Sequence, residues 1–429
     1  MPWWVATRER TLLSESNSHP TGAVAAADAE VELVPATHPS EKRTFGELLT
    51  SDLRALPVII GLVALWIFFI LQNDVFLTPR NLSNLLIQST VVGVMALGLM
   101  FVLLVKEIDL SVAAINGVTA VLMAKLIVEF GASPWVAIPL AIVVGALIGC
   151  VSARWVTFVG VPSFVVTLGL GLGLNGLQLI LLPTTARYGL MGTSVETIAL
   201  AKIDGLAAWG VLAIGVGLYG LLVLSSIVRR RRAGLSVSMV KGLALPLVGV
   251  TLFGAVVVAI LNAHQGIPVV TLVFSALLGL GGYVLNETQF GLHLYAVGNN
   301  DEAARRAGIK VSRVKMAAFA IAGGISAIAG VIGASRSLGV GVFSGGGVGG
   351  GTLLLECIAA AVIGGVSLFG GRGSIHAPLL GSLVIGSVQN GLNLMGVHDE
   401  IRLIVTGLLL VLAVSIDKLI EKFTGQQSF

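Results

Sequence analysis

The segment LSNLLIQSTVVGVMALGLMFVLLV, residues 82–105, holds 24 consecutive positions without an Asp, Glu, Lys or Arg. A helix of this length extends about 36 Å, and the hydrocarbon core of a bilayer is about 30 Å thick. Similar runs recur along the 429-residue chain, which is 55% hydrophobic and 11% charged with a mean hydropathy of +0.97. Soluble domains carry about 25% charged residues. The sequence therefore predicts an all-α polytopic membrane protein.

The apolar runs predict about twelve transmembrane helices, each long enough to cross the hydrocarbon layer. They are residues 53–71, 82–105, 108–128, 134–153, 162–183, 204–226, 240–261, 266–286, 314–334, 353–369, 374–396 and 402–417. Many of these segments are rich in Gly, and small residues allow helix backbones to approach closely in a membrane. We expect the glycines to serve mainly in this packing.

The distribution of Lys and Arg predicts the orientation, since cytoplasmic loops carry an excess of these residues. If the N-terminus starts inside, 20 of the 26 Lys and Arg residues fall on the inner side and 6 on the outer side. We therefore predict that both termini are cytoplasmic. The net charge of +4 fits an inner rim facing anionic membrane lipid, and it gives no indication of nucleic acid binding. Cys150 and Cys357 lie inside predicted spans, so neither a disulfide nor a metal site is expected.

The polar segments divide the chain. Residues 1–45 lack hydrophobic periodicity and predict a flexible cytoplasmic N-terminal tail, followed by a transmembrane domain at 46–429. Within it, residues 184–262 have the pattern of an inserted two-span module. The run Arg229–Arg232 in that module is best explained as an anchor at the lipid headgroups, with a binding role as the alternative.

Residues 298–309, GNNDEAARRAGI, form a short charged island between apolar segments. Asn300 is suited to cap a helix, Asp301 and Glu302 favour its first turn, and Arg305 and Arg306 favour its last turn. Gly308 fits the left-handed position after a helix. The pairs Asp301–Arg305 and Glu302–Arg306 have i,i+4 spacing. We expect a self-capped helix of about two turns that binds a soluble partner; the alternative is an ordinary solvated loop.

The island and several other motifs resemble one known family. The matching stretches are 290–297, FGLHLYAV; 107–112, EIDLSV; 161–169, VPSFVVTLG; 362–374, VIGGVSLFGGRGS; and 390–394, NGLNL. Taken in their order along the chain, these stretches are similar to ABC transporter permeases of the ribose/xylose monosaccharide importer class. The resemblance covers about residues 53–420. Within this class, the chain is most similar to xylose-type permeases in its length and in having the inserted module at 184–262. The chain has Lys106-Glu107 before Ile-Asp-Leu-Ser, where the family usually has a small residue.

The resemblance implies ABC importer permease architecture in the bacterial cytoplasmic (inner) membrane, with 290–313 as a cytoplasmic coupling loop. The implied partners are an ABC ATPase subunit, a periplasmic or extracytoplasmic sugar-binding protein and a second permease copy in a homodimer. The residues that would contact the ATPase are Asn299, Glu302, Ala303, Ala304, Arg305 and Gly308. Arg372 would either contact the ATPase or anchor its own turn.

Neutral hydrogen-bonding side chains within the predicted spans are candidates for a sugar path. They are Gln88, Asn116, Asn175, Gln178, Asn390 and Asn393, with Gln389 beside them. Polar groups in a membrane protein avoid lipid and face protein or water. The alternative role for each is a hydrogen bond between helices.

The sequence contains no Gly-Lys dipeptide and so no GxxxxGK[ST] phosphate loop. A separate ATPase would supply the energy, and the chain itself is expected to be a transport subunit without cofactor, metal or catalytic residues. Residues 345–351 contain GxGxxG, but no strand precedes them, so dinucleotide binding is not expected.

We expect this chain to import a monosaccharide, a pentose such as xylose. The alternatives are a secondary, ion-coupled sugar transporter, which needs no ATPase, and an intramembrane enzyme, for which no catalytic pattern is present.

Overall fold

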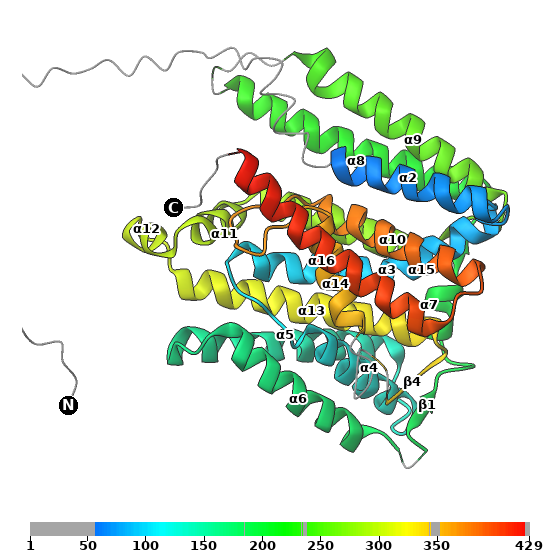
Figure 1. Cartoon of the computed structure of the whole chain (residues 1–429), viewed down its shortest axis with the longest axis horizontal. Helices are drawn as coiled ribbons and strands as arrows, with labels where there is room; N and C mark the ends of the chain where they lie inside the picture. The colour runs from blue at the N-terminus through cyan, green and yellow to red at the C-terminus, as the bar shows by residue number, and fades with distance from the viewer. Residues whose placement is uncertain are drawn as a thin grey trace, which may run out of the picture. The chain divides into compact units, whose positions relative to one another are not determined.

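The computed structural model describes residues 56–424 except 184, 233, 235–237, 343 and 345–351. Most of these residues are helical, and the long helices lie roughly side by side (Figure 1). The predicted tail at 1–45 and the glycine-rich segment at 345–351 lie outside the described residues.

The first half of the described chain contains α2 (Leu56–Gln72), α3 (Pro79–Leu104), α4 (Val112–Val128), α5 (Pro134–Val159), α6 (Ser163–Leu181), β1 (Arg187–Gly189), α7 (Glu196–Leu200), β2 (Lys202–Ile203) and α8 (Gly205–Arg232). The second half contains the π-helical turn η1 (Val240–Ala244), α9 (Leu245–Asn262), β3 (Ile267–Pro268), α10 (Val269–Glu287), α11 (Gln289–Asn299), α12 (Asp301–Arg306), α13 (Val311–Arg336), β4 (Gly339–Gly341), α14 (Thr352–Ile363), α15 (Ala377–Leu394) and α16 (Asp399–Thr424).

Seven of the described helices are long and apolar enough to cross a membrane, by length and composition. They are α3, α5, α6, α8, the η1–α9 segment, α10 and α13, and three shorter apolar helices, α2, α4 and α14, accompany them. Each of the twelve predicted segments overlaps one described helix. The polytopic, helical fold is therefore confirmed, while the count of twelve spans stays a prediction.

Two predicted segments extend about four to six residues beyond the helix at one end. The segment 353–369 is helical only to Ile363, because Gly365 adopts a left-handed φ of 103°. Val366 N donates to Ala361 O, and Gly365 N donates to Val362 O, which closes the helix in a Schellman motif. The segment 108–128 becomes helical only at Val112, because the Asp109 carboxylate accepts the backbone N–H of Ser111 and holds a turn.

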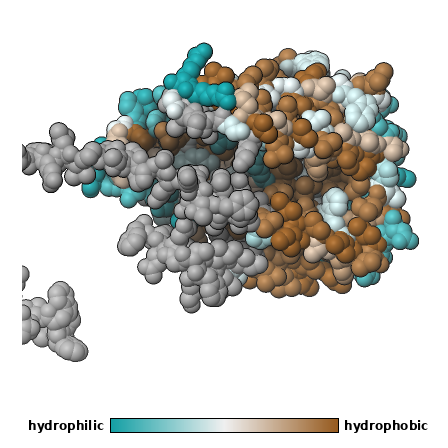
Figure 2. Space-filling view, turned by 90° about the horizontal axis from the view of Figure 1, so that it is seen from above, coloured by the Kyte–Doolittle hydropathy of each residue, from teal (hydrophilic) through white to brown (hydrophobic). Residues whose placement is uncertain are grey.

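The hydrophobic core follows α3 and α13. In its most apolar stretch α3 is 83% buried and α13 is 61% buried, whereas the corresponding stretches of α8 and α9 are only 6% buried. Apolar residues also cover much of the described surface, with hydrophilic residues gathered toward the ends of the helices (Figure 2). A protein whose outside is as apolar as this is suited to lipid rather than water.

Close packing of α5 on α13 depends on small residues. A Cβ on Gly145 would lie 2.5 Å from the Gly323 carbonyl oxygen, and a Cβ on Gly149 would collide with the Phe319 carbonyl. Gly145 and Gly149 form a GxxxG motif, which allows two helix backbones to touch where lipid provides no hydrophobic drive for association. The predicted packing role is confirmed for Gly323 but not for Gly333, which has open space beside its Cα.

The segment 184–262 contains two long helices, α8 and α9, whose side chains pack on each other. Two short antiparallel pairings tie the first part of this segment to later parts of the chain: β1 pairs with β4, and β2 pairs with β3. The side chain of Arg229 on α8 forms an ion pair with Glu287 on α10. That this segment is an insertion stays a prediction.

Candidate functional site

The charged island forms α12 and is capped at its start as predicted. The Asn300 side-chain oxygen accepts the backbone N–H of Ala303 at 2.9 Å. Asp301 and Glu302 occupy the first turn, where negative charge is favoured by the exposed N–H groups, and Arg305 and Arg306 occupy the last turn. The local sequence therefore favours the start of a helix at this position.

The end of α12 is also set by its own sequence. Gly308 has a left-handed φ of 84°. Gly308 N donates to Arg305 O, and Ile309 N donates to Ala304 O, both at 3.0 Å, which is a Schellman motif. The predicted left-handed role of Gly308 is confirmed. Its part in binding a partner stays a proposal.

The side chains of α12 divide into an exposed face and one anchor. Glu302, Ala303, Arg305 and Arg306 are exposed. Ala304 is 4% exposed and packs in the main core cluster. The Ala304 side chain therefore faces the protein and holds the helix against it, while the expected part of Ala304 in the ATPase contact stays a prediction.

One of the two predicted ion pairs within α12 is present. Arg306 lies 3.2 Å from Glu302, with both side chains mostly exposed. The predicted Asp301–Arg305 pair is wrong: Asp301 lies 2.7 Å from Lys315 of α13 instead. Among the described residues Arg305 has no ion-pair partner, so its guanidinium remains available on the outer face of α12.

The end of α11 meets two other segments just before α12. A Cβ on Gly298 would collide with the Leu104 carbonyl oxygen at the end of α3, and would lie 2.5 Å from Gly371 N. Leu104 O itself accepts the N–H of Gly371 at 3.0 Å. Only glycine at 298 and 371 leaves room for these three backbones. The 362–374 motif is thus joined to the start of the island.

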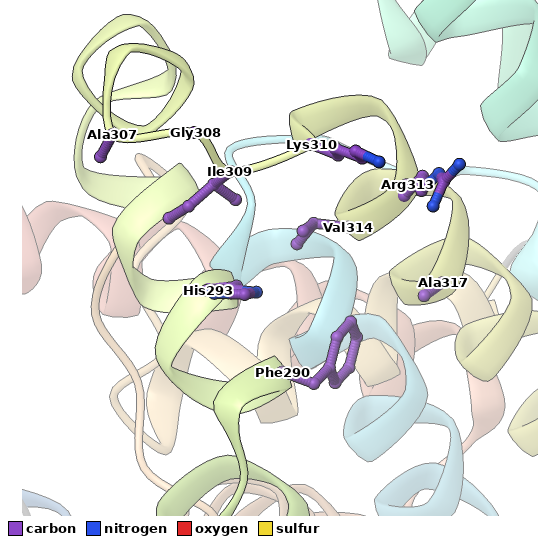
Figure 3. Close-up of a pocket in the computed structure, with 9 residues that line it drawn as sticks. All are labelled: Phe290, His293, Ala307, Gly308, Ile309, Lys310, Arg313, Val314 and Ala317. Carbon is purple, nitrogen blue, oxygen red and sulfur yellow. The ribbon is translucent and has the colours of Figure 1, made fainter.

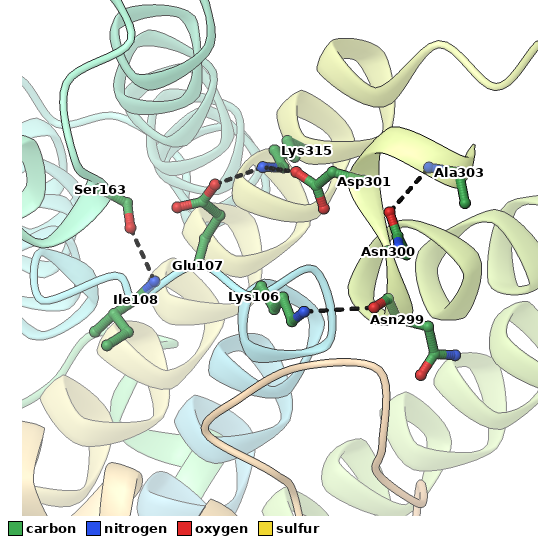
Figure 4. Close-up of polar contacts among 9 residues, drawn as sticks. All are labelled: Lys106, Glu107, Ile108, Ser163, Asn299, Asn300, Asp301, Ala303 and Lys315. Atoms are coloured by element: carbon green, nitrogen blue, oxygen red, sulfur yellow. Dashed lines mark hydrogen bonds and ion pairs between the residues drawn. The ribbon is translucent and has the colours of Figure 1, made fainter. Parts of the chain in front are cut away.

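Further polar contacts strengthen this junction (Figure 4). Lys106 Nζ lies 3.4 Å from Asn299 O, and Tyr295 Oη donates to Gly373 O at 3.0 Å. Arg372 O accepts the N–H of Ser367, which shapes its own turn. Asn299 is exposed, so its side chain remains a candidate contact beside α12.

A pocket of about 420 Å³ opens beside α12, between α11 and the start of α13 (Figure 3). Phe290, Ile309 and Val314 line it with apolar surface, and Lys310 and Arg313 add two exposed cations. A pocket with both kinds of lining, next to an exposed helix, is suited to receive a projecting side chain of another protein.

Three of the predicted sugar-path residues form hydrogen bonds to other segments of the protein. Asn390 of α15 and Asn81 of α3 exchange two hydrogen bonds, at 2.8 and 3.0 Å. Asn116 donates to Ser326 O of α13 at 3.2 Å. Gln178 donates to the backbone oxygens of Gly341 and Ser344 at 3.0 and 3.1 Å. All three side chains are buried, which fits the alternative role of hydrogen bonding within the protein, and their part in a sugar path stays a prediction.

The other predicted path residues lie apart. Gln88 on α3 and Asn175 on α6 are half-buried, and Asn393 on α15 is exposed. The Asn175 side-chain oxygen has no hydrogen-bond partner within the described part of the chain. Gln389 is half-buried on α15. The structure does not bring these side chains together in the pocket described above.

Two residues in this region were missed by sequence reasoning. Lys315 Nζ lies 2.7 Å from Glu107 Oε1 and 2.7 Å from Asp301 Oδ2, and thereby joins three segments (Figure 4). A Lys near the start of an otherwise apolar helix, together with a Glu at an unusual position before Ile-Asp-Leu-Ser, is the signal that points to such a contact.

Comparison with known protein families places residues 81–414 in one described as branched-chain amino acid transport system / permease component. The chain belongs to this permease family. The matched residues run from α3 into α16 and include α12 and every segment that contacts it.

Several curated relatives are similar over most of this permease. It is 35% identical to the xylose transport system permease protein XylH of Haemophilus influenzae, over 74% of this chain and 84% of the relative. It is also 35% identical to XylH of Escherichia coli K12, over 75% of this chain and 80% of the relative. The ribose import permease protein RbsC of Bacillus subtilis is 32% identical, over 71% and 74%. The comparison with solved structures found no match. This permease is therefore a multi-pass membrane protein whose relatives are transport subunits rather than enzymes.

Proposed function

We propose that this chain is the membrane-spanning permease subunit of an ATP-driven ABC importer that carries a monosaccharide, a pentose such as xylose, into the cytoplasm. The xylose and ribose permeases named above, with similarity over most of the chain, support the sugar class. The absence of a GxxxxGK[ST] phosphate loop from the sequence supports a separate ATPase subunit.

The observation that carries the proposal is the exposed face of α12. This helix is capped at both ends by its own residues and anchored by Ala304, while Glu302, Ala303 and Arg305 point away from the core. Charged side chains such as Glu302 and Arg305 are unfavourable in lipid, and the rest of the described protein does not bury this face. We assign it to contact with the ATPase subunit, with the neighbouring pocket receiving part of that partner (Figure 3).

In the proposed complex, two permease copies form a homodimer around a central path, and an extracytoplasmic sugar-binding protein delivers the sugar on the opposite side. Both termini and α12 lie in the cytoplasm, as the distribution of Lys and Arg favours. ATP binding and hydrolysis shift the permease between inward-open and outward-open states, and the permease itself makes no covalent bond. Gln88, Asn175 and Asn393 remain the candidates for sugar contact.

The test reverses two charges on the exposed face, in the variant Glu302→Lys with Arg305→Glu. Because neither side chain supports the core, the variant is expected in the membrane at the normal amount. It should fail to co-purify with the ATPase and should lose ATP-dependent uptake of pentose. The matched control is Arg154→Glu, which reverses an exposed charge whose described contact is the Phe158 ring.

Two outcomes would contradict the proposal. Normal uptake and normal co-purification by the double variant would remove α12 from the ATPase interface. Uptake by the unaltered permease that follows a proton gradient and ignores ATP would instead establish the secondary transporter.

A further inference from the structure

A partly buried cation links α12 to the segment between α3 and α4. Lys315 lies in the first turns of α13, and its Nζ is 2.7 Å from both Glu107 Oε1 and Asp301 Oδ2. The side chains of Lys315 and Glu107 are each 13% exposed, and that of Asp301 is 36% exposed. Partly buried ion pairs with short, direct contacts are screened by solvent far less than surface pairs.

The two carboxylates belong to different parts of the molecule. Asp301 is the first residue of α12, the helix assigned above to the ATPase contact. Glu107 belongs to residues 105–111, the connecting segment between α3 and α4. One lysine therefore holds the end of a surface helix and the end of an internal segment at the same point (Figure 4).

The 105–111 segment is in turn bonded to the start of α6. Ile108 N donates to Ser163 Oγ at 3.1 Å, and Leu110 N donates to Thr167 Oγ1 at 3.0 Å. Asp109 is fully buried and accepts both the N–H and the hydroxyl of Ser111, at 2.8 and 2.6 Å, where α4 begins. A displacement of Glu107 therefore acts on the first turns of both α4 and α6.

Among the described residues, few other polar contacts connect the 105–111 segment to the region of α12. Lys106 Nζ reaches Asn299 O at 3.4 Å, a long hydrogen bond to the residue that ends α11. Ala304 packs in the same core cluster as Val105 and Ile108, so the remaining link between α12 and this segment is apolar. Among the described residues, the two short ion pairs of Lys315 are the direct charged link between α12 and this segment.

We propose that Lys315 is a positioning residue that couples movement of α12 to the 105–111 segment, and through Ser163 and Thr167 to α6. This inference rests on the proposed function, since it takes the ATPase as the source of the movement. With the ion pairs intact, a shift of α12 pulls Glu107 with it. Without the cation, two neighbouring carboxylates repel, and α12 moves without the segment. Hydrolysis of ATP then continues while import of sugar fails.

The experiment uses the complete transporter, with permease, ATPase and sugar-binding protein, in liposomes. It measures ATP hydrolysis and sugar uptake in the same preparation. In Lys315→Met, we expect the ATPase to co-purify with the permease and to hydrolyse ATP within about two-fold of the unaltered rate. The number of sugar molecules transported per ATP should fall at least about ten-fold. Lys315→Arg keeps the positive charge and should retain most of the unaltered ratio of sugar transported to ATP hydrolysed.

The control is Arg154→Met, which removes an exposed cation at the same end of the bundle, with Phe158 as its described contact. Its ratio should be unchanged. If Lys315→Met does not reach the membrane, Glu107→Gln supplies the test, because it breaks one ion pair and leaves one carboxylate beside Lys315; its ratio should also fall. Adding Asp301→Asn to Lys315→Met should lower the ratio no further.

An unchanged ratio of transport to hydrolysis in Lys315→Met, or in Glu107→Gln where that variant is used, would overturn the inference. That result would leave the α12 contact intact, since the complex would still form and import sugar. Failure of the proposed function gives a different pattern: no ATPase would co-purify with the unaltered permease, and ATP would not drive uptake.

Discussion

Asn81 and Asn390 face each other across α3 and α15 and exchange two hydrogen bonds, at 2.8 and 3.0 Å. Both side chains are buried, and Asn81 also donates to Phe76 O at 2.9 Å. A reciprocal amide pair of this kind satisfies one donor and one acceptor of each side chain inside the bundle.

This pair predicts a loss of stability in Asn390→Ala. The substitution leaves the Asn81 side-chain oxygen without its donor in a buried site, which costs about 1–3 kcal/mol. We expect a lower melting temperature of the purified permease in detergent. Asn393→Ala is the matched control, because the Asn393 side chain is exposed on the same helix, and its melting temperature should not change. An Asn390→Ala protein of normal stability that has lost sugar uptake would return Asn390 to the sugar path.

The cap of α12 predicts a local effect of Asn300→Ala. Replacing a capping Asn by Ala destabilises a helix by about 1 kcal/mol, so amide hydrogen exchange should accelerate at 301–306. Asn300→Ser, which keeps a side-chain oxygen acceptor, should restore most of the protection. Equal exchange in Asn300→Ala and the unaltered chain would show that packing of Ala304, rather than the cap, maintains this helix.

The contact of α5 with α13 predicts a strong response to a single methyl group. In Gly149→Ala the new Cβ collides with the Phe319 carbonyl, and overpacking of this kind costs about 1–3 kcal/mol. Gly169→Ala adds the same methyl group where nothing lies within 4 Å, and it should leave the melting temperature unchanged or slightly raised. Equal melting temperatures for the two variants would contradict the assigned backbone contact.

Glu129, at the end of α4, predicts a pH dependence of stability. The Tyr188 hydroxyl, and then Lys125 at 2.9 Å, hydrogen-bond its carboxylate and hold the pKa of Glu129 below its ordinary value of 4.5. A lowered pKa in the folded state means that the stabilisation is present above pH 4.5 and is lost as the pH falls through the folded-state pKa. The melting temperature of the unaltered chain should therefore exceed that of Glu129→Gln near pH 7, and the difference should shrink in acid. A difference that grows in acid would be the wrong sign.

The sequence predicted those features that depend on residues close together in the chain. The apolar runs located the helices, and Asn300 and Gly308 predicted both ends of α12, because hydrophobic patterning and caps act over a few residues. The end of α14 was placed six residues late because the left-handed conformation of Gly365 was not predicted, whereas Gly364 does pack closely, on the Ala377 backbone.

Contacts between distant segments were not predictable in the same way. Asp301 was expected to pair with Arg305, four residues away, but it pairs with Lys315, which α13 brings close. Asn116 and Asn390 have the same residue type as a sugar-binding side chain, and only the positions of Ser326 and Asn81 show that they are already engaged. The residues next to Asp301, Asn116 or Asn390 in the chain do not indicate which distant helix packs against each of them.

The most direct test of the central claim is uptake of labelled xylose by liposomes that contain this permease, an ABC ATPase subunit and a sugar-binding protein, with ATP supplied on the ATPase side. We predict uptake that requires ATP and the ATPase and that disappears in Glu302→Lys with Arg305→Glu. Uptake of equal rate without the ATPase, driven by an ion gradient alone, would contradict the account.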